Sequence, residues 1–121
     1  MGETFTAWIP TASGFWLLVI SCVVAILISE TTSNTAAVTI VVPVVLALAK
    51  GAGLDPVVPA LGATLAGSLG FMLPVSTPCN AIVYGSGYIP LGRMIRWGLA
   101  LDVVGVVVVI AMVRLLAPLL R

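Results

Sequence analysis

Two short polar runs interrupt a strongly apolar chain, SETTSNTAAV at residues 29–38 and PVSTPCNA at residues 74–81. Both are rich in hydroxyl and amide side chains, and together they carry one charged side chain, that of Glu30. A helix that begins or ends inside a membrane leaves backbone N–H and C=O groups without partners, and lipid cannot satisfy them. N–H groups at a helix start suit anions, whereas C=O groups at a helix end suit Na⁺ together with nearby hydroxyls. The two runs therefore predict a site for ions that bind and leave, as in a secondary transporter.

Hydroxyl residues in both runs stand where a helix is expected to resume. Ser33 or Thr35 is placed to cap a helix that begins near Ala36. Thr77 is placed to cap a second helix, with Pro78 at its first position, where a missing N–H costs nothing. A different interpretation is that such hydroxyls only bond to neighbouring helices, and we adopt it for isolated threonines. Two clustered runs, each followed by a capped helix, favour transport instead.

The composition places the whole chain in a membrane. Of its 121 residues, 61% are hydrophobic and 7% are charged, and the mean hydropathy is +1.28. A soluble domain is roughly 45–50% apolar and about 25% charged. The net charge of +1, without a basic patch, argues against a nucleic-acid partner, and the absence of histidine and of a nucleophile–base pair argues against an enzyme. Cys22 and Cys79 are expected to be small buried side chains.

The apolar segments predict an all-α integral membrane fold, a single membrane domain over residues 1–121 that crosses the plasma or inner membrane several times. The expected elements, in order, are a helical hairpin at 14–50, a discontinuous helix at 56–89 that is broken at 74–80, an interfacial helix at 90–97 and a transmembrane helix at 98–117. The stretch 57–73 is expected to be helical up to the break, and its glycines and alanines let helices approach closely in lipid. Arg93 and Arg96, beside Trp97, indicate the interfacial helix.

The first two apolar segments, 14–29 and 36–49, are short for membrane crossings. At about 1.5 Å per residue, the first barely reaches across a hydrocarbon core about 30 Å thick. Two short arms joined by a polar tip predict a re-entrant hairpin, which enters and leaves the membrane on the same side. Two thin spanning helices with an ordinary surface loop are the alternative. Pro43, within the second arm, is expected to be tolerated as a kink.

The motifs SETTSNTA, GFMLPVSTPCNAIVYGSGYI and MIRWGLALDVVGVVVV resemble the divalent anion:sodium symporter family of dicarboxylate, citrate and sulfate transporters. The resemblance covers nearly the whole chain and corresponds to the C-terminal part of an inverted-repeat transporter, without the first repeat. It implies an elevator-type homodimer in the lipid bilayer, with Na⁺ as coupling ion and a small anionic substrate. The missing N-terminal repeat would be a partner of this segment. A neutral pocket of asparagine and threonine accepts dicarboxylates, citrate or sulfate alike, so the anion is left open.

The same resemblance implies which residues form the site. The implied substrate-binding residues are Ser33, Asn34, Thr35, Thr77, Pro78 and Asn80. The implied Na⁺ ligands are Ser29, Thr32, Asn34 and Ser76, partly through carbonyl groups. Asn34 and Thr35 would hydrogen-bond a substrate carboxylate, and Thr77 would face the substrate. The chain departs from the family pattern at Cys79, which replaces a usual second proline, and at Ser76, where alanine is frequent.

We therefore expect part of a Na⁺-coupled symporter for divalent anions, which supplies one Na⁺ site and half of the substrate site. The alternative is a truncated or accessory membrane subunit without transport activity of its own, in which the motifs are inherited but unused. The missing repeat would supply the other Ser-Asn-Thr tip and the other Na⁺ site, so this chain alone is not expected to complete a transport cycle. A neighbouring reading frame that encodes the missing half would separate the two hypotheses.

Overall fold

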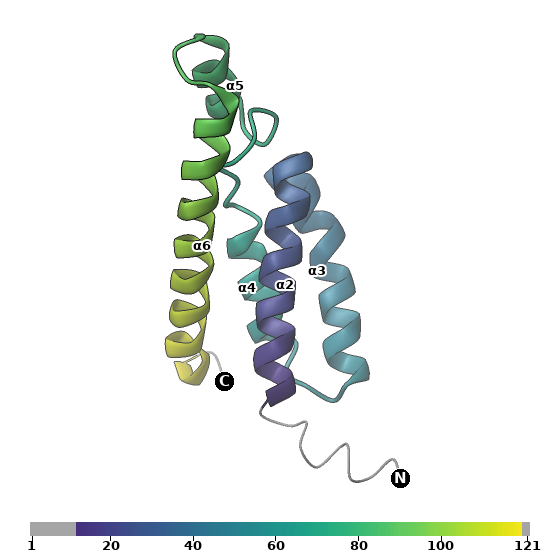
Figure 1. Cartoon of the computed structure of the whole chain (residues 1–121). Coiled ribbons are helices and arrows are strands. Elements are labelled where there is room, and N and C mark those ends of the chain that lie inside the picture. Colours follow the sequence, from purple (N-terminus) through teal and green to yellow (C-terminus); the bar gives the residue numbers. More distant parts are fainter. Residues whose placement is uncertain (1–11, 120–121) are drawn as a thin grey trace, which may run out of the picture.

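A computed structural model describes residues 12–119 of the chain, and in this range it contains helices and no strand (Figure 1). The elements are α2 (Ala12–Thr31), α3 (Asn34–Gly51), α4 (Val57–Ala66), α5 (Pro78–Gly85), α6 (Leu91–Leu116) and the short 3-10 helix η1 (Ala117–Leu119). Three segments are long and apolar enough to cross a membrane, namely Gly14–Thr31, Asn34–Gly51 and Leu91–Leu119. The predicted all-helical fold is confirmed for the described residues.

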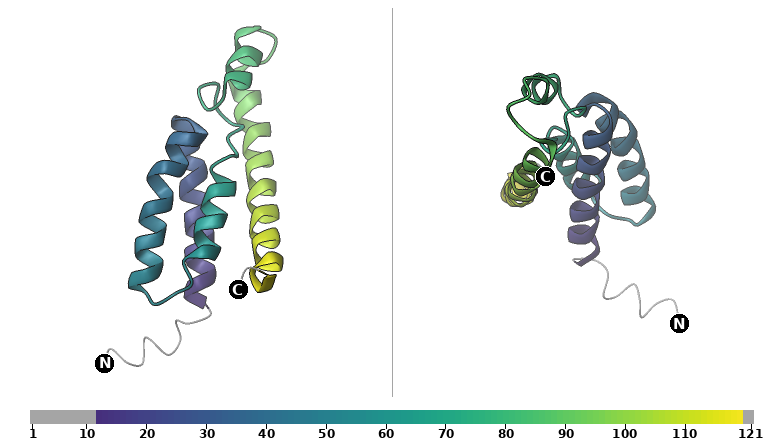
Figure 2. Two further views of the ribbon diagram at one scale, coloured as in Figure 1. Left: turned by 180° about the vertical axis from the view of Figure 1, so that it is seen from behind. Right: turned by 45° about the horizontal axis from the view of Figure 1, so that its top comes forward.

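Helices α2 and α3 lie side by side and antiparallel, and the chain turns between them at Thr32 and Ser33 (Figures 1 and 2). They contain 20 and 18 residues, so at about 1.5 Å per residue they are about 30 and 27 Å long. Both are longer than the sequence segments suggest, and each has the length of a full crossing. Helix α3 continues through Pro43, so this proline is tolerated within the arm, as expected, and its side chain is exposed. The re-entrant path of this hairpin stays a prediction.

Helix α4 lies between the hairpin and α6 (Figures 1 and 2). Its buried face consists of a proline and three small residues, Pro59, Gly62, Ala63 and Ala66. A Cβ atom on Gly62 would lie 2.2 Å from Leu18 Cδ1 of α2, so any larger residue would displace this leucine side chain. The close packing predicted from the small residues of this helix is confirmed, because in lipid such faces bring backbones together.

The chain is not helical between α4 and α5, over residues 67–77, which we call the crossing segment. The sequence predicted a helix up to residue 73, and that prediction was wrong: α4 ends at Ala66, and the break is wider than 74–80. Glycine at 67 and 70 weakens a helix here, and Pro74 cannot continue one. In addition, the backbone N–H groups of residues 72 and 73 donate to a side chain of α2, so they are not available to a helix.

Helix α5 follows the crossing segment and lies at the same end of the molecule as the turn of the hairpin (Figure 1). Cys79, near its start, is exposed, so the prediction that this residue is buried was wrong. Cys22 is buried in α2, as predicted. Both thiols are free.

Helix α6 is one continuous helix of 26 residues, Leu91–Leu116. The sequence predicted two elements, an interfacial helix at 90–97 and a separate transmembrane helix, so the predicted boundary was wrong. The reason is that Gly98 is the only candidate for a break there, and one glycine inside a helix costs only about 1 kcal/mol. Gly98 has another role: a Cβ atom on it would lie 2.3 Å from Phe71 O, so it lets α6 pack directly on the crossing segment.

Candidate functional site

The turn of the hairpin brings a serine near the end of α2 next to the first residue of α3. Ser33 caps α3, and its side chain accepts a hydrogen bond of 3.2 Å from the Ala36 N–H. Of the two residues predicted as candidates for this cap, Ser33 and Thr35, Ser33 is therefore confirmed. Ser29 is fully buried, and its Oγ lies 2.6 Å from Asn34 Oδ1 and 2.8 Å from Gly67 O. The single hydroxyl hydrogen serves one or the other acceptor, so three oxygen atoms meet here around one hydrogen.

The amide of Asn34 also ties the hairpin to the crossing segment. Its Nδ2 donates to Ser68 O at 3.2 Å, while its Oδ1 faces Ser29 as described above. One side chain at the start of α3 therefore contacts both α2 and the segment that follows α4. The amide carries two N–H groups and an acceptor oxygen, so it can bind a cation on one side and an anion on the other.

The second polar run is organised by Asn80. Thr77 caps α5, as predicted, and accepts a hydrogen bond of 3.1 Å from the Asn80 N–H, with Pro78 at the first helical position. The Asn80 side-chain Nδ2 lies 3.0 Å from Gly70 O, 3.1 Å from Leu73 O and 3.0 Å from Ser76 Oγ. Asn80 thus holds the crossing segment in place against the start of α5.

Gly70 is the point at which the two runs meet. A Cβ atom on Gly70 would lie 3.3 Å from Ser29 Oγ, 3.4 Å from Ser76 Cβ and 3.5 Å from Asn34 Oδ1. Ser76 Oγ lies 2.7 Å from Gly70 O, and Ser76 is buried. Residues from α2, α3 and the crossing segment therefore converge on one backbone position that has no side chain of its own.

Three of the four residues implied as Na⁺ ligands, Ser29, Asn34 and Ser76, lie in this cluster. The fourth, Thr32, does not: its hydroxyl donates to Ile28 O of its own helix at 2.7 Å, and the residue is exposed. Hydroxyl, amide and carbonyl oxygens are the donors that transporters use for Na⁺. Residues 12–119 contain no group of three or more His, Cys, Asp or Glu side chains that could hold a metal ion in another way.

The residues implied in substrate binding line the starts of the two helices. Ser33 and Thr77 cap α3 and α5, and Thr35 and Pro78 are exposed in their first turns. Both helix starts lie beside the cluster at Gly70 through Asn34 and Asn80, which belong to α3 and α5. Two helix N-termini with hydroxyl caps favour a negatively charged group.

Sequence reasoning assigned no function to two buried acids near this cluster. Glu30 is 2% exposed, and its carboxylate accepts hydrogen bonds from the Met72 N–H at 2.9 Å and the Leu73 N–H at 2.8 Å. Asp102, in the middle of α6, is 3% exposed. The signal that could have found them is general: an acid inside an apolar membrane segment is rare and costly, and usually has a function.

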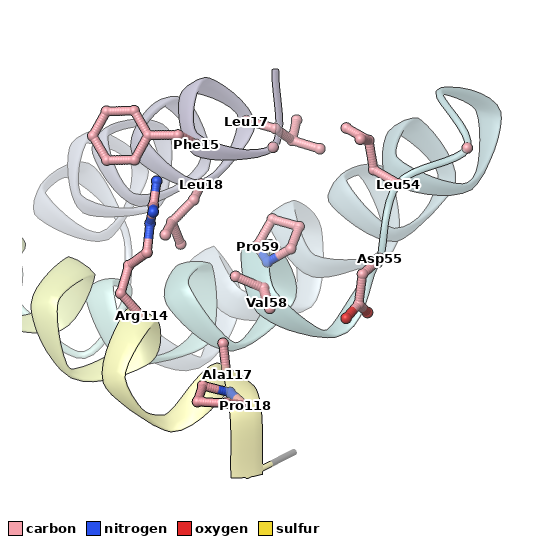
Figure 3. A pocket seen from close by; sticks show the side chains of 12 residues that line it. Phe15, Leu17, Leu18, Leu54, Asp55, Val58, Pro59, Arg114, Ala117 and Pro118 are labelled. Atoms are coloured by element: carbon pink, nitrogen blue, oxygen red, sulfur yellow. The ribbon is translucent and has the colours of Figure 1, made fainter. Parts of the chain in front are cut away.

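A cavity of about 550 Å³ lies at the other end of the bundle, between α2, α4 and the end of α6 (Figure 3). The Arg114 guanidinium lies over the Phe15 ring, 4.7 Å from its centre. None of the predicted site residues lines this cavity. Phe15 and Ser29 are separated by about four turns of α2, so the cavity is about 21 Å from the hairpin turn and is not the candidate ion site.

The fold and the site define a class of protein: a multi-pass membrane protein whose helices stop and restart at two converging polar sites, the arrangement typical of secondary transporters. The chain matches the family model for the sodium:sulfate symporter transmembrane region over residues 1–120. It belongs to this family, the divalent anion:sodium symporters, and is an integral membrane protein. The family consists of transporters, not enzymes, and the predicted family is confirmed.

Curated relatives agree with this assignment. The chain is 39% identical to the Na(+)/citrate cotransporter of Rattus norvegicus over 89 residues, which are 74% of this chain and 15% of that protein. It is 42% identical to solute carrier family 13 member 2 of Mus musculus over 109 residues, 90% of this chain and 18% of that protein. It is 34% identical to the sodium-dependent dicarboxylate transporter SdcS of Staphylococcus aureus (strain MRSA252) over 90 residues, 74% of this chain and 17% of that protein. The chain thus spans less than a fifth of the length of these relatives.

Proposed function

We propose that this chain supplies one Na⁺ site and half of the substrate site of a Na⁺-coupled symporter for divalent anions, such as succinate, citrate or sulfate. The observation that carries the proposal is the convergence of Ser29, Asn34 and Ser76 around Gly70. The relatives named for sodium-dependent citrate and dicarboxylate transport support both the ion and the class of substrate.

The Na⁺ site would use oxygen atoms that have more lone pairs than hydrogen-bond donors around them. Ser29 Oγ, Asn34 Oδ1 and Gly67 O share one hydroxyl hydrogen, so a cation can take the lone pairs that this hydrogen leaves unused. Ser76, whose Cβ lies beside the same position of Gly70, adds a second hydroxyl oxygen. Because Na⁺ would touch both the hairpin and the crossing segment, its binding would fix the two polar runs relative to each other.

The anion would bind beside this ion, at the starts of α3 and α5. The N-terminal N–H groups of two helices and the cap hydroxyls of Ser33 and Thr77 would face its oxygens. Asn34 would couple the two ligands, because its amide has an oxygen for the cation and N–H groups for a carboxylate. The bound Na⁺ would also reduce the cost of bringing a dianion into a low-dielectric site.

The remainder of the transporter would come from residues other than these 121. We propose that an N-terminal repeat supplies the other Ser-Asn-Thr tip and the other Na⁺ site, that the hairpin is re-entrant, and that the complete protein is a homodimer in the plasma or inner membrane. The second candidate is a truncated or accessory membrane subunit without transport activity of its own.

Uptake measurements decide between the two. Radiolabelled succinate, citrate and sulfate are supplied to cells or proteoliposomes that contain the assembled transporter, in Na⁺ and in K⁺. We expect Na⁺-dependent uptake of at least one anion, and its loss in the Asn34→Ala variant. Uptake that is absent under every condition, with the protein present in the membrane, would favour the accessory subunit. Uptake that does not depend on Na⁺ would contradict the ion site.

A further inference from the structure

A second candidate site lies at the end of the bundle remote from the two polar runs. It is the cavity of about 550 Å³ between α2, α4 and the end of α6, which is a partly open cleft and not an enclosed void (Figure 3). Its volume lies within the range of about 300–1,000 Å³ that is usual for small-molecule sites. None of the residues proposed to bind Na⁺ or the anion lines this cleft, so a ligand here would be a different one.

The walls of the cleft are mostly apolar. Apart from Arg114 and Asp55, its lining residues are apolar or glycine, among them Leu17, Val58 and Pro59 (Figure 3). Asp55 has a structural contact, because its Oδ1 accepts a hydrogen bond of 3.0 Å from a backbone N–H at the start of α4. Apolar walls of this kind favour hydrocarbon over a small hydrated ion such as sulfate or succinate.

Among the described residues that line the cleft, Arg114 is the only cation. Its guanidinium lies over the Phe15 ring, 4.7 Å from the ring centre. The ring attracts the positive charge, but it provides no lone pair for the N–H groups of the guanidinium. These N–H groups form a planar fork that matches two oxygens of a phosphate or carboxylate group. The cleft therefore combines an apolar wall with one anion-binding side chain.

The depth of the cleft in the membrane decides which anions can reach it. The start of α2, the end of α3 and the end of α6 lie at the same end of the molecule (Figures 1 and 2). Phe15 belongs to the first turn of α2 and Arg114 to the last turn of α6. This end lies near a membrane surface whether the hairpin spans the membrane or returns to the same side, and arginine side chains in such positions extend toward the lipid headgroups. At this depth, the phosphate of a phospholipid is the nearest anion.

We propose that this cleft binds a membrane phospholipid, with the phosphodiester on the Arg114 guanidinium and part of an acyl chain along the apolar wall that includes Leu17 and Val58. The phosphate supplies acceptors for the N–H groups of Arg114, while Phe15 holds the guanidinium in place. Because α2, α4 and α6 all line the cleft, a bound lipid would join three helix ends. The lipid site is separate from the proposed Na⁺ site and does not depend on the proposed transport function.

Lipid retention tests the charged part of the site. The intact transporter that contains this segment is purified in detergent, mixed with dioleoyl phosphatidylglycerol and analysed for bound lipid by native mass spectrometry. We expect Arg114→Gln to bind this lipid about tenfold or more weakly than the parent, because it loses a hydrogen bond to a charged group. Arg96→Gln is the matched control, since it removes the same charge from an exposed position nearer the other end of α6. Parent affinity in Arg114→Gln overturns the proposal, and so does an equal loss in Arg96→Gln.

A second variant tests the apolar part without a change of charge. Gly14 lines the cleft, and a Cβ atom on it would meet nothing within 4 Å, so Gly14→Leu should be tolerated and should occupy space that the acyl chain needs. Its lipid affinity should fall at an unchanged unfolding midpoint of the lipid-free protein. Gly92→Leu is the control, because Gly92 also has open space around it but does not line the cleft. Equal lipid affinities of these two variants overturn the proposal.

Competing ligands identify the source of the phosphate. Inorganic phosphate, glycerol 3-phosphate and succinate carry an anionic group but no acyl chain, so none of them should displace the lipid at millimolar concentration. None should raise the unfolding midpoint of the parent more than that of Arg114→Gln. A free anion that does either shows that the cleft takes soluble anions, which overturns the proposal. If residues outside the described range fill the cleft, lipid retention will not depend on Arg114, and this result overturns it as well.

Discussion

Two serines on α2 allow the proposed Na⁺ site to be distinguished from an ordinary packing contact. Ser29 and Ser21 are both buried, at 0% and 3% exposure, and lie two turns apart on the same face. Each hydroxyl reaches a backbone carbonyl 38 residues further along the chain, Gly67 O at 2.8 Å and Pro59 O at 3.2 Å. They differ in their second contact: Ser29 Oγ also lies 2.6 Å from Asn34 Oδ1, in the proposed ion site, whereas Ser21 Oγ also lies 2.9 Å from Leu18 O of its own helix.

Alanine at either position should reduce stability by a similar amount. Each change removes one hydroxyl hydrogen bond between α2 and the α4 region, which is worth about 0.5–1.5 kcal/mol. Only Ser29→Ala should also weaken Na⁺ binding. If the loss of a ligand oxygen costs as much as a hydrogen bond to a charged group, about 1.5–3 kcal/mol, the Na⁺ concentration for half-maximal uptake should rise roughly 10- to 150-fold.

The assay is Na⁺-stimulated anion uptake by the intact transporter that contains this segment, with thermal unfolding measured in parallel. The expected result is equal destabilisation of the two variants and a change in Na⁺ dependence for Ser29→Ala alone. Equal Na⁺ dependence of the Ser29 and Ser21 variants would refute the placement of the ion at Ser29. The cluster around Gly70 would then be a packing contact between the hairpin and the crossing segment.

Three further changes test other parts of the site. Thr77→Val removes a helix cap worth about 0.5–2 kcal/mol and a proposed ligand contact, so anion affinity should fall about tenfold or more. Thr77→Ser keeps the hydroxyl and should leave anion affinity nearly unchanged. Equal anion affinities of the two variants would show that Thr77 is only a packing residue. Gly98→Ala should lower the unfolding midpoint, because its Cβ would meet backbone at 2.3 Å, whereas Gly92→Ala on the same helix has open space; equal midpoints would contradict the close contact. In a cysteine-free background, a bulky, membrane-impermeant maleimide polymer should label cysteine at Gly51 but not at Thr35, and labelling of Thr35 from the opposite side would show that the hairpin spans the membrane.

Much of the local structure could be predicted from the sequence because it depends on neighbours in the chain. The cap of α5 requires Thr77 and a following proline, and both are visible in the sequence as one motif. The same holds for the cap by Ser33 and for the close approach of α4, whose glycines and alanines recur on one face. In each case the residues that cause the structure lie within a few positions of one another.

The error at the end of α4 has the opposite origin. The helix that was expected to reach residue 73 stops at Ala66, and the residue that fixes the crossing segment, Glu30, lies about forty positions earlier in the chain. The convergence of the two polar runs also depends on Gly70. This residue has no functional group, so nothing in the sequence identifies it as part of a site. Its role is to leave room for Ser29, Asn34 and Ser76. Spacing alone could suggest that these residues act together, but not where they meet.

Glu30 explains why the break in this transporter segment can be wide. A chain that leaves the helical path inside a membrane exposes several N–H groups, and each needs a partner. The Glu30 carboxylate accepts hydrogen bonds from two of them, Met72 N–H and Leu73 N–H, so these two groups do not need water as a partner. Because Glu30 directly follows Ser29 on α2, the same helix end holds the crossing segment and contributes to the cluster around Gly70. A movement of the hairpin turn would therefore displace the crossing segment with it. Na⁺ bound at the hairpin turn would in the same way change the position of the crossing segment.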